Sequence, residues 1–167
     1  MSTGAFYHHL KGKEDIIIEG YSECDKYFDE YEVNHLEAED IIDKIIEYIG
    51  YQTKYAKMLG VDAITQIYKA QLTHGNEFFL SDNHALSSNL LILIQKAQDE
   101  GVLRTDYRAN QIRDELLLIS RGTIYNCSQK WRICSYRLYK DIGVHFLSNV
   151  RFQVNFPLLF FSNSNVS

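Results

Sequence analysis

The sequence predicts an all-helical (all-α) fold, and three observations support that class. First, 46% of its 167 residues are hydrophobic, enough to build one substantial core. Second, Pro157 is the only proline, so about 150 residues run without the residue that interrupts helices most strongly. Third, clusters of Gly, Pro and Asn are few, whereas folds built from strands need such clusters at their turns.

A short first helix is predicted from Ser2 or Thr3, either of which can cap its start, to about Leu10. Gly12 separates it from a second helix, which has acidic residues in its first turn, where they suit the helix dipole. Along this second helix an apolar stripe about four turns long is formed by Ile17, Tyr21, Cys24, Tyr27, Phe28 and Tyr31.

The same periodicity predicts further helices at residues 38–59, 62–73, 84–100, 107–130 and 135–152. Gly60 and Gly101 are expected to end two of them, the second in a Schellman-like turn. Gly122 lies inside the helix at 107–130, where it costs about 1 kcal/mol relative to alanine. We therefore expect another helix to pack closely against Gly122.

The net charge of −5 is distributed unevenly along the chain. Residues 14–120 carry 9 basic and 21 acidic residues, whereas residues 1–13 carry a net +2 and residues 121–167 a net +5. An acidic body repels a phosphate backbone, so any contact with nucleic acid must lie at a basic end. The N-terminal end is the one that also has the pattern of a helix start.

Several classes of protein are disfavoured. The longest purely apolar run, LLILI at 90–94, is far shorter than the ~20 residues a bilayer span needs, and there is no secretory signal, so we expect a soluble, cytoplasmic protein without a membrane partner. Three cysteines are too few for a disulfide framework; we expect small reduced residues, with a redox pair of Cys127 and Cys134 as the alternative. Glu32 and His35 have a metal-like spacing, but di-iron bundles need two such pairs and more glutamates. We expect no enzyme, metal or cofactor.

The stretch STGAFYHHLKGKEDII at residues 2–17 resembles the tetracycline-repressor (TetR) family, in which the recognition helix of a helix-turn-helix gives way to a long linking helix through such a pattern. The family pattern is a small polar residue, Gly, an aromatic-Tyr pair, a basic or aromatic pair, a large apolar residue, then Lys-x-Lys followed by acidic and apolar residues. The matching positions are Thr3, Gly4, Phe6, Tyr7, His8, His9, Leu10, Lys11, Lys13, Glu14 and Ile16. A second stretch, IQKAQDEGVLRTDYRANQI at 94–112, is similar to the family's Gln-x-x-Gly-x-Leu-Arg-x-Asp turn between two C-terminal helices.

The resemblance implies a TetR-like helical bundle with a partial N-terminal helix-turn-helix. The family has two further helices before the recognition helix, and the sequence given starts at the turn. We expect residues 1–20 to form the partial DNA-binding element, residues 21–152 the ligand-binding and dimerisation domain, and residues 153–167 a tail. Without its partner helices a short recognition helix is marginal, so this chain alone should bind DNA weakly or not at all.

The resemblance also implies site residues. At the DNA, Thr3 and Tyr7 would contact phosphate or base edges and Lys13 a phosphate, and the full candidate set is Thr3, Gly4, Tyr7, His8, His9 and Lys13. The family's middle helices enclose a small-molecule pocket, for which the candidates are Tyr55, Tyr68, Phe79 and Tyr125, with ordinary core packing as the alternative for each. The last two helices resemble the family's dimer-forming pair, with candidates Ile112, Leu116, Ile119 and Thr123.

The sequence therefore predicts a homodimeric repressor that leaves its DNA operator when an unidentified small-molecule effector binds, through a shift in population between two states. The alternative is a stand-alone helical module that binds a ligand or dimerises without binding DNA.

In a chain that carries the complete DNA-binding module, Lys13→Ala should weaken operator binding about equally across sequences. Loss of one phosphate contact should also reduce the slope of log affinity against log salt concentration by about one. Fluorescence anisotropy at several salt concentrations measures both quantities. An unchanged salt slope removes Lys13 from the phosphate contacts.

Overall fold

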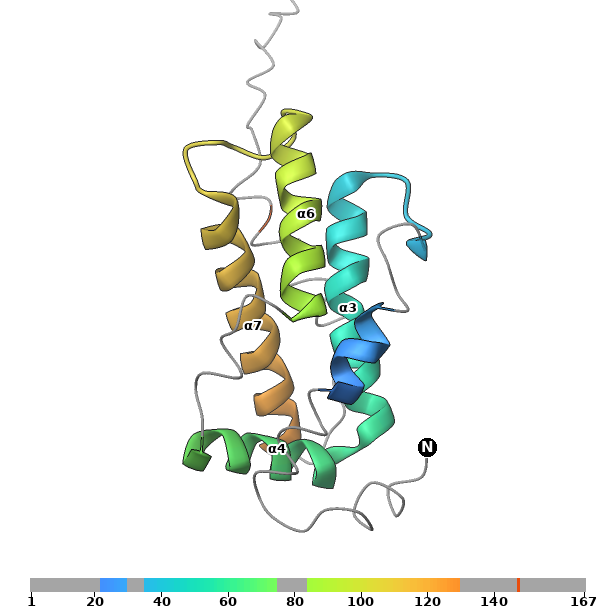
Figure 1. Cartoon of the computed structure of the whole chain (residues 1–167), viewed down its shortest axis with the longest axis vertical. Helices are drawn as coiled ribbons and strands as arrows, with labels where there is room; N and C mark the ends of the chain where they lie inside the picture. The colour runs from blue at the N-terminus through green and yellow to red at the C-terminus, as the bar shows by residue number, and fades with distance from the viewer. Residues whose placement is uncertain (1–21, 30–34, 75–83, 130–146, 148–167) are drawn as a thin grey trace, which may run out of the picture.

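The computed structural model describes residues 22–29, 35–74, 84–129 and 147, and every regular element in these ranges is a helix (Figure 1). The predicted all-helical class is confirmed for this part of the chain. Three helices run side by side and each contacts the other two: α3 (Ile41–Leu59), α6 (Ala85–Asp99) and α7 (Ala109–Gln129). The fourth, α4 (Val61–His74), lies across the end at which α3 and α7 finish. Helical residues 22–29 pack against α3.

Both ends of α3 follow from its sequence. The Asp40 carboxylate accepts hydrogen bonds from the backbone N–H of Ile42 at 2.8 Å and of Asp43 at 3.3 Å, as an N-cap residue does. At the other end Gly60 adopts a φ of 84°, which glycine reaches without steric cost, and its N–H donates to the Ala56 carbonyl at 3.1 Å. The helix is therefore fixed at Ile41–Leu59, within the predicted range 38–59.

The end of α6 has the hydrogen bonds of a Schellman motif, as predicted. Gly101 has a φ of 70°, and the Val102 N–H donates to the Ala97 carbonyl at 2.9 Å. Leu103, the next residue, is fully buried, so the turn anchors itself in the core as it leads into α7. Beyond the turn the chain reverses direction, and α6 runs antiparallel to both α7 and α3 (Figure 1).

The core lies between α3, α6, α7 and residues 22–29. The isoleucine side of α3 faces it, and one fully buried residue from each of the other elements meets it: Phe28, Leu90 and Ile112 are at most 2% exposed. Leu147 is the one described residue of the predicted helix 135–152, and it too is buried in this core. Tyr48 is completely buried, and its hydroxyl donates to the Ala85 carbonyl at 3.1 Å, which ties α3 to the first residue of α6.

The expectation for Gly122 is not met. Apart from its chain neighbours and the backbone of its own helix, no atom of the described residues lies within 4 Å of an ideal Cβ placed at Gly122, and the residue is exposed on α7. The glycine is therefore not explained by a close approach of another described helix.

None of the described helices combines the length and apolar character needed to cross a bilayer. The predicted DNA-binding element at residues 1–20 and the predicted tail at residues 153–167 lie outside the described residues.

Leu90→Ala should lower the free energy of unfolding by about 2–5 kcal/mol, because it leaves a cavity at a fully buried position. The matched control is Ile92→Ala on the same helix, where the side chain is 53% exposed, and its cost should stay below about 1 kcal/mol. Urea unfolding followed by circular dichroism measures both. Equal costs would mean that the assigned core face of α6 is wrong.

Candidate ligand-binding site

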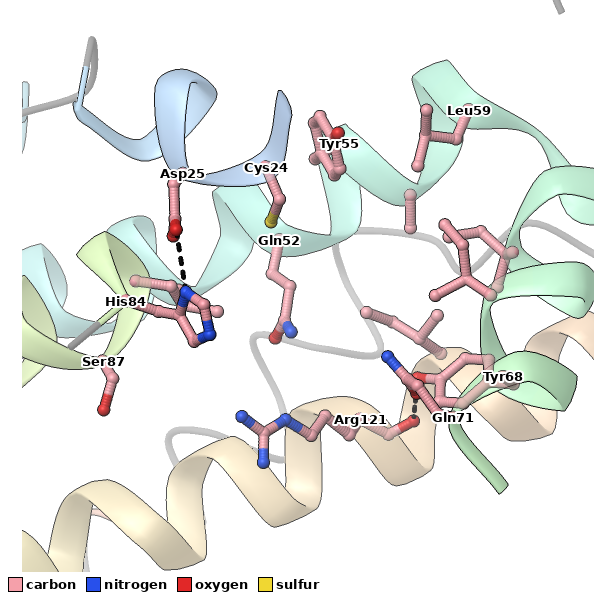
Figure 2. Close-up of a pocket in the computed structure, with 15 residues that line it drawn as sticks. Cys24, Asp25, Gln52, Tyr55, Leu59, Tyr68, Gln71, His84, Ser87 and Arg121 are labelled. Carbon is pink, nitrogen blue, oxygen red and sulfur yellow. Dashed lines mark hydrogen bonds and ion pairs between the residues drawn. The ribbon is translucent and has the colours of Figure 1, made fainter. Parts of the chain in front are cut away.

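A cavity of about 100 Å³ opens where α3, α4 and α7 meet residues 22–29 and the start of α6 (Figure 2). Its volume is of the order of cavities that accept a single aromatic ring. The walls are mostly apolar, and their aliphatic part is formed by Ala56, Leu59, Ile64, Ile67, Leu86 and Ile124. A few polar side chains from different helices complete the lining, and three sets of hydrogen bonds hold these helices together around it.

The first set is formed by the Asp25 carboxylate. One oxygen lies 2.7 Å from Nδ1 of His84, and the other accepts from the backbone N–H of Ala85 at 3.2 Å (Figure 2). The side chains of Asp25 and His84 are 32% and 16% exposed, so the contact is largely shielded from water. We call these two contacts the Asp25 clamp. It joins residues 22–29 to the first turn of α6 at one end of the cavity.

The second bond joins α3 to α7. The hydroxyl of Ser120, which is fully buried, donates to Oε1 of Gln52. Because this oxygen is engaged, the amide N–H groups of Gln52 remain for other acceptors. In Figure 2 the Gln52 side chain extends between Cys24 and Arg121, into the middle of the cavity.

The third bond joins α4 to α7. The Tyr68 hydroxyl donates to the backbone carbonyl of Arg121 at 3.0 Å, while the guanidinium of Arg121 extends the other way, toward the His84 end of the cavity (Figure 2). Burial raises the pKa of the Tyr68 hydroxyl and of the Cys24 thiol, each to about 12, and the positive charge of Arg121 partly opposes both shifts. Both groups are therefore neutral at physiological pH, and the positive charge of Arg121 acts on groups in two walls of the cavity, Cys24 and Tyr68.

Tyr55 contributes a ring to the wall and an unsatisfied hydroxyl. Its ring lies 4.9 Å from that of Tyr27, measured between centroids. Its hydroxyl oxygen is buried and has no hydrogen-bond partner among the described residues, and burial raises the pKa of this phenol. A buried polar group left unpaired costs about 1–3 kcal/mol, which makes this wall less stable than one in which every group is paired.

The structure places the predicted pocket residues in different ways. Tyr55 and Tyr68 line the cavity. Tyr125 does not line it; it is 47% exposed on α7, and its ring meets that of Tyr68 edge-on with centroids 5.8 Å apart. Phe79 lies outside the described residues, as do all six residues predicted to contact DNA: Thr3, Gly4, Tyr7, His8, His9 and Lys13.

Two of the four residues predicted for a dimer interface are core residues. Ile112 and Leu116 are each 2% exposed and pack in the core that α7 shares with α3 and α6. A side chain already covered within its own chain has no surface left to bury against a second copy, so the predicted interface is corrected at these positions. Ile119 and Thr123 are half-buried, and the Thr123 hydroxyl donates to the Ile119 carbonyl at 2.8 Å.

Most of the polar cavity residues were not singled out from the sequence. Two signals point to them in retrospect. His84 occupies the N-cap position of α6 but its side chain does not cap the helix, and histidine is not a preferred residue there. Arg121 is the single charged residue between Glu115 and Lys130. Neither signal identifies the residue or ligand with which His84 or Arg121 interacts.

The cysteines differ from one another. Cys24 is a free thiol in the cavity wall, whereas Cys127, near the end of α7, is disulfide-bonded, which corrects the expectation of reduced residues at that position. Cys134 lies outside the described residues. Within the described ranges no group of three or more His, Cys, Asp or Glu residues is placed to hold a metal ion.

The chain has no match among protein-family models, curated proteins or solved structures. Function is therefore inferred from the cavity and from the two sequence motifs. The cavity can accept a small, mostly apolar molecule and orient it with a few hydrogen bonds, which is the usual construction of a ligand site.

The stability difference between the parent chain and Tyr68→Phe should depend on pH. Below pH 10 the variant should be less stable by roughly 1 kcal/mol, because the bond to the Arg121 carbonyl is lost. The folded pKa of about 12 exceeds the ordinary 10.0, so the contribution of the Tyr68 phenol is present below pH 10 and is lost as pH rises from 10 to 12. By pH 11 the parent should have lost roughly 1 kcal/mol relative to the variant. Urea unfolding at pH 9, 10 and 11 measures the difference, and a constant difference would contradict a buried, protonated phenol.

Proposed function

We propose that the protein is a DNA-binding transcriptional regulator of the TetR type, a homodimeric repressor that acts in the cytoplasm and is controlled by a small molecule bound in the cavity. The observation that carries the proposal is the composition of the cavity wall. Cys24 and Asp25 line the cavity and belong to helical residues 22–29. In the sequence these residues follow closely after residues 2–17, the motif that resembles a DNA-reading helix. A ligand that contacts this wall therefore contacts residues that are close in the sequence to the stretch proposed to read DNA.

The Asp25 clamp supplies the physical link between the two sites. It is a polar connection that holds residues 22–29 to the first turn of α6, and both Asp25 and His84 line the cavity. A ligand that binds better when the clamp is open than when it is closed shifts the population toward the open arrangement. Movement of residues 22–29 would then change the spacing of the two recognition helices in a dimer, and operator affinity would fall.

The exposed side of α7 supports dimerisation through a surface that keeps two of the residues first predicted and adds three others. Leu118 is 70% exposed and Tyr125 is 47% exposed, and they lie four positions before and three positions after Gly122 on the same helix face. A glycine between two exposed apolar side chains allows close approach of a second helix. We therefore include Leu118, Gly122 and Tyr125, with the half-buried Ile119 and Thr123, in the proposed dimer surface.

The alternative function is a ligand-binding or dimerisation module that does not bind DNA. The cavity and the exposed face of α7 fit this alternative equally well. The difference rests entirely on residues 1–13, whose Tyr7, His8, His9 and Lys13 match the family's DNA-contacting positions. DNA-binding experiments therefore separate the two functions.

Ala56→Phe should remove ligand binding by filling the cavity. The probe is benzyl alcohol, a neutral single-ring molecule that should bind the parent chain with roughly millimolar affinity. Met58→Phe is the matched control, because Met58 lies two residues away on α3, is 65% exposed and does not line the cavity. Isothermal titration calorimetry should show binding to the parent and to Met58→Phe but not to Ala56→Phe, with circular dichroism to verify that both variants fold.

The coupling between ligand binding and DNA binding is measured in a chain that carries the complete DNA-binding module. The DNA duplexes are selected from a random-sequence pool. Benzyl alcohol should lower the DNA affinity of the Met58→Phe protein and leave that of the Ala56→Phe protein unaffected. Selection that enriches no duplex, together with normal binding of benzyl alcohol, would contradict a regulator and favour the stand-alone module.

A further inference from the structure

Two groups that donate hydrogen bonds extend into the cavity from facing helices. Gln52 on α3 presents its amide N–H groups, since its Oε1 accepts from Ser120 and no described residue accepts from Nε2. Arg121 on α7 directs its guanidinium toward the same space (Figure 2). An arginine and an amide N–H together bind an oxygen acceptor, and an anionic acceptor gives the stronger bonds.

The charges around the cavity favour an anion rather than a cation. Asp25 is the one carboxylate in the described wall, and its two oxygens are already engaged by His84 Nδ1 and by the Ala85 N–H. Cys24 and Tyr68 are neutral, because burial raises the pKa of each to about 12, and burial likewise keeps Tyr55 neutral. The remaining charged group that extends into the cavity is the guanidinium of Arg121.

The apolar walls restrict the rest of the ligand. Ile64 and Ile67 line the cavity from α4, and Leu59, the last residue of α3, lies away from the Asp25 clamp (Figure 2). A sugar or a nucleotide would leave its hydroxyl groups against these side chains without partners, at a cost for each unpaired group. A cavity of about 100 Å³ accepts about one ring or a short aliphatic chain.

We propose that the ligand of this cavity is a small apolar carboxylic acid, with its carboxylate held by Arg121 and Gln52 and its apolar body against Leu59, Ile64 and Ile67. This inference rests on the proposed function, because it names the chemical class of the effector that the cavity senses. It does not depend on whether Arg121 has a further interaction within the protein, since a guanidinium carries five N–H donors.

Three single-ring probes that differ in charge test this class on the full 167-residue chain: benzoate, benzyl alcohol and benzylamine. At neutral pH, isothermal titration calorimetry should give benzoate at least about tenfold higher affinity than benzyl alcohol, because charge-assisted bonds form only with the anion. Benzylamine, a cation, should bind more weakly than either. Equal affinity for benzoate and benzyl alcohol, or preference for benzylamine, would overturn the proposal.

Two substitutions in the cavity assign the preference to its residues. Arg121→Met should lower benzoate affinity by about tenfold or more and leave benzyl alcohol within about threefold, and Arg121→Lys should keep part of the preference because it keeps the charge. Gln52→Glu retains an acceptor for Ser120 but replaces the N–H groups with a negative oxygen, so it should lower benzoate affinity and raise that of benzylamine. The matched control is Arg108→Met at an exposed position outside the cavity, which should bind all three probes as the parent does.

The outcomes also separate this inference from the proposed function. Binding of benzyl alcohol without a preference for benzoate overturns the carboxylic acid class but leaves a ligand-sensing cavity. Failure of all three probes to bind, in a chain that circular dichroism shows to be folded, overturns both. Equal loss of benzoate and benzyl alcohol in Arg121→Met would mean that Arg121 supports the wall rather than binding the anion.

Discussion

The start of α6 depends on a carboxylate that is distant from it in the sequence. His84 occupies the N-cap position but makes no side-chain cap, and the Asp25 carboxylate from residues 22–29 accepts the N–H of Ala85 instead. The same carboxylate orients the His84 ring, and on the other side the Tyr48 hydroxyl from α3 binds the Ala85 carbonyl. The first turn of α6 is thus held by two other elements, and the position of residues 22–29 is coupled to that of α6.

The helices around the cavity are joined by hydrogen bonds between polar groups rather than by apolar packing through its centre. Ser120 to Gln52 joins α7 to α3, and Tyr68 to the Arg121 carbonyl joins α4 to α7. The tightly packed core lies beyond them, around Leu90. A space bounded by hydrogen-bonded helices and aliphatic walls can remain open for a ligand, whereas side chains in a well-packed core leave few voids larger than a water molecule.

The helices could be predicted from the sequence because their signals are local. Apolar periodicity with Gly60 and Gly101 located α3 and α6 to within a few residues, and Asp40, whose capping role had not been singled out, accounts for the start of α3 at Ile41. The Asp25 clamp could not be predicted, because His84 lies 59 positions after Asp25 and helical periodicity carries no information about contacts between helices.

The apolar stripe that contains Ile112 and Leu116 also shows that periodicity does not identify the surface that covers a helix. An apolar stripe must be buried, but the sequence does not say whether its own chain or a second copy covers it.

The proposed ligand class and the Asp25 clamp together give the direction of the coupling. A carboxylate held by Arg121 and Gln52 would bring a second negative charge into a cavity whose wall already contains Asp25. Like charges in a poorly solvated space repel, so an anion at Arg121 would weaken the hold of Asp25 on His84 and Ala85. Coupling between two sites is reciprocal, so an arrangement in which residues 22–29 have left α6 would bind the anion more tightly. In the proposed regulator, ligand binding would therefore favour release of residues 22–29 from α6, and that release would favour ligand binding. The effector would thus act to lower DNA affinity.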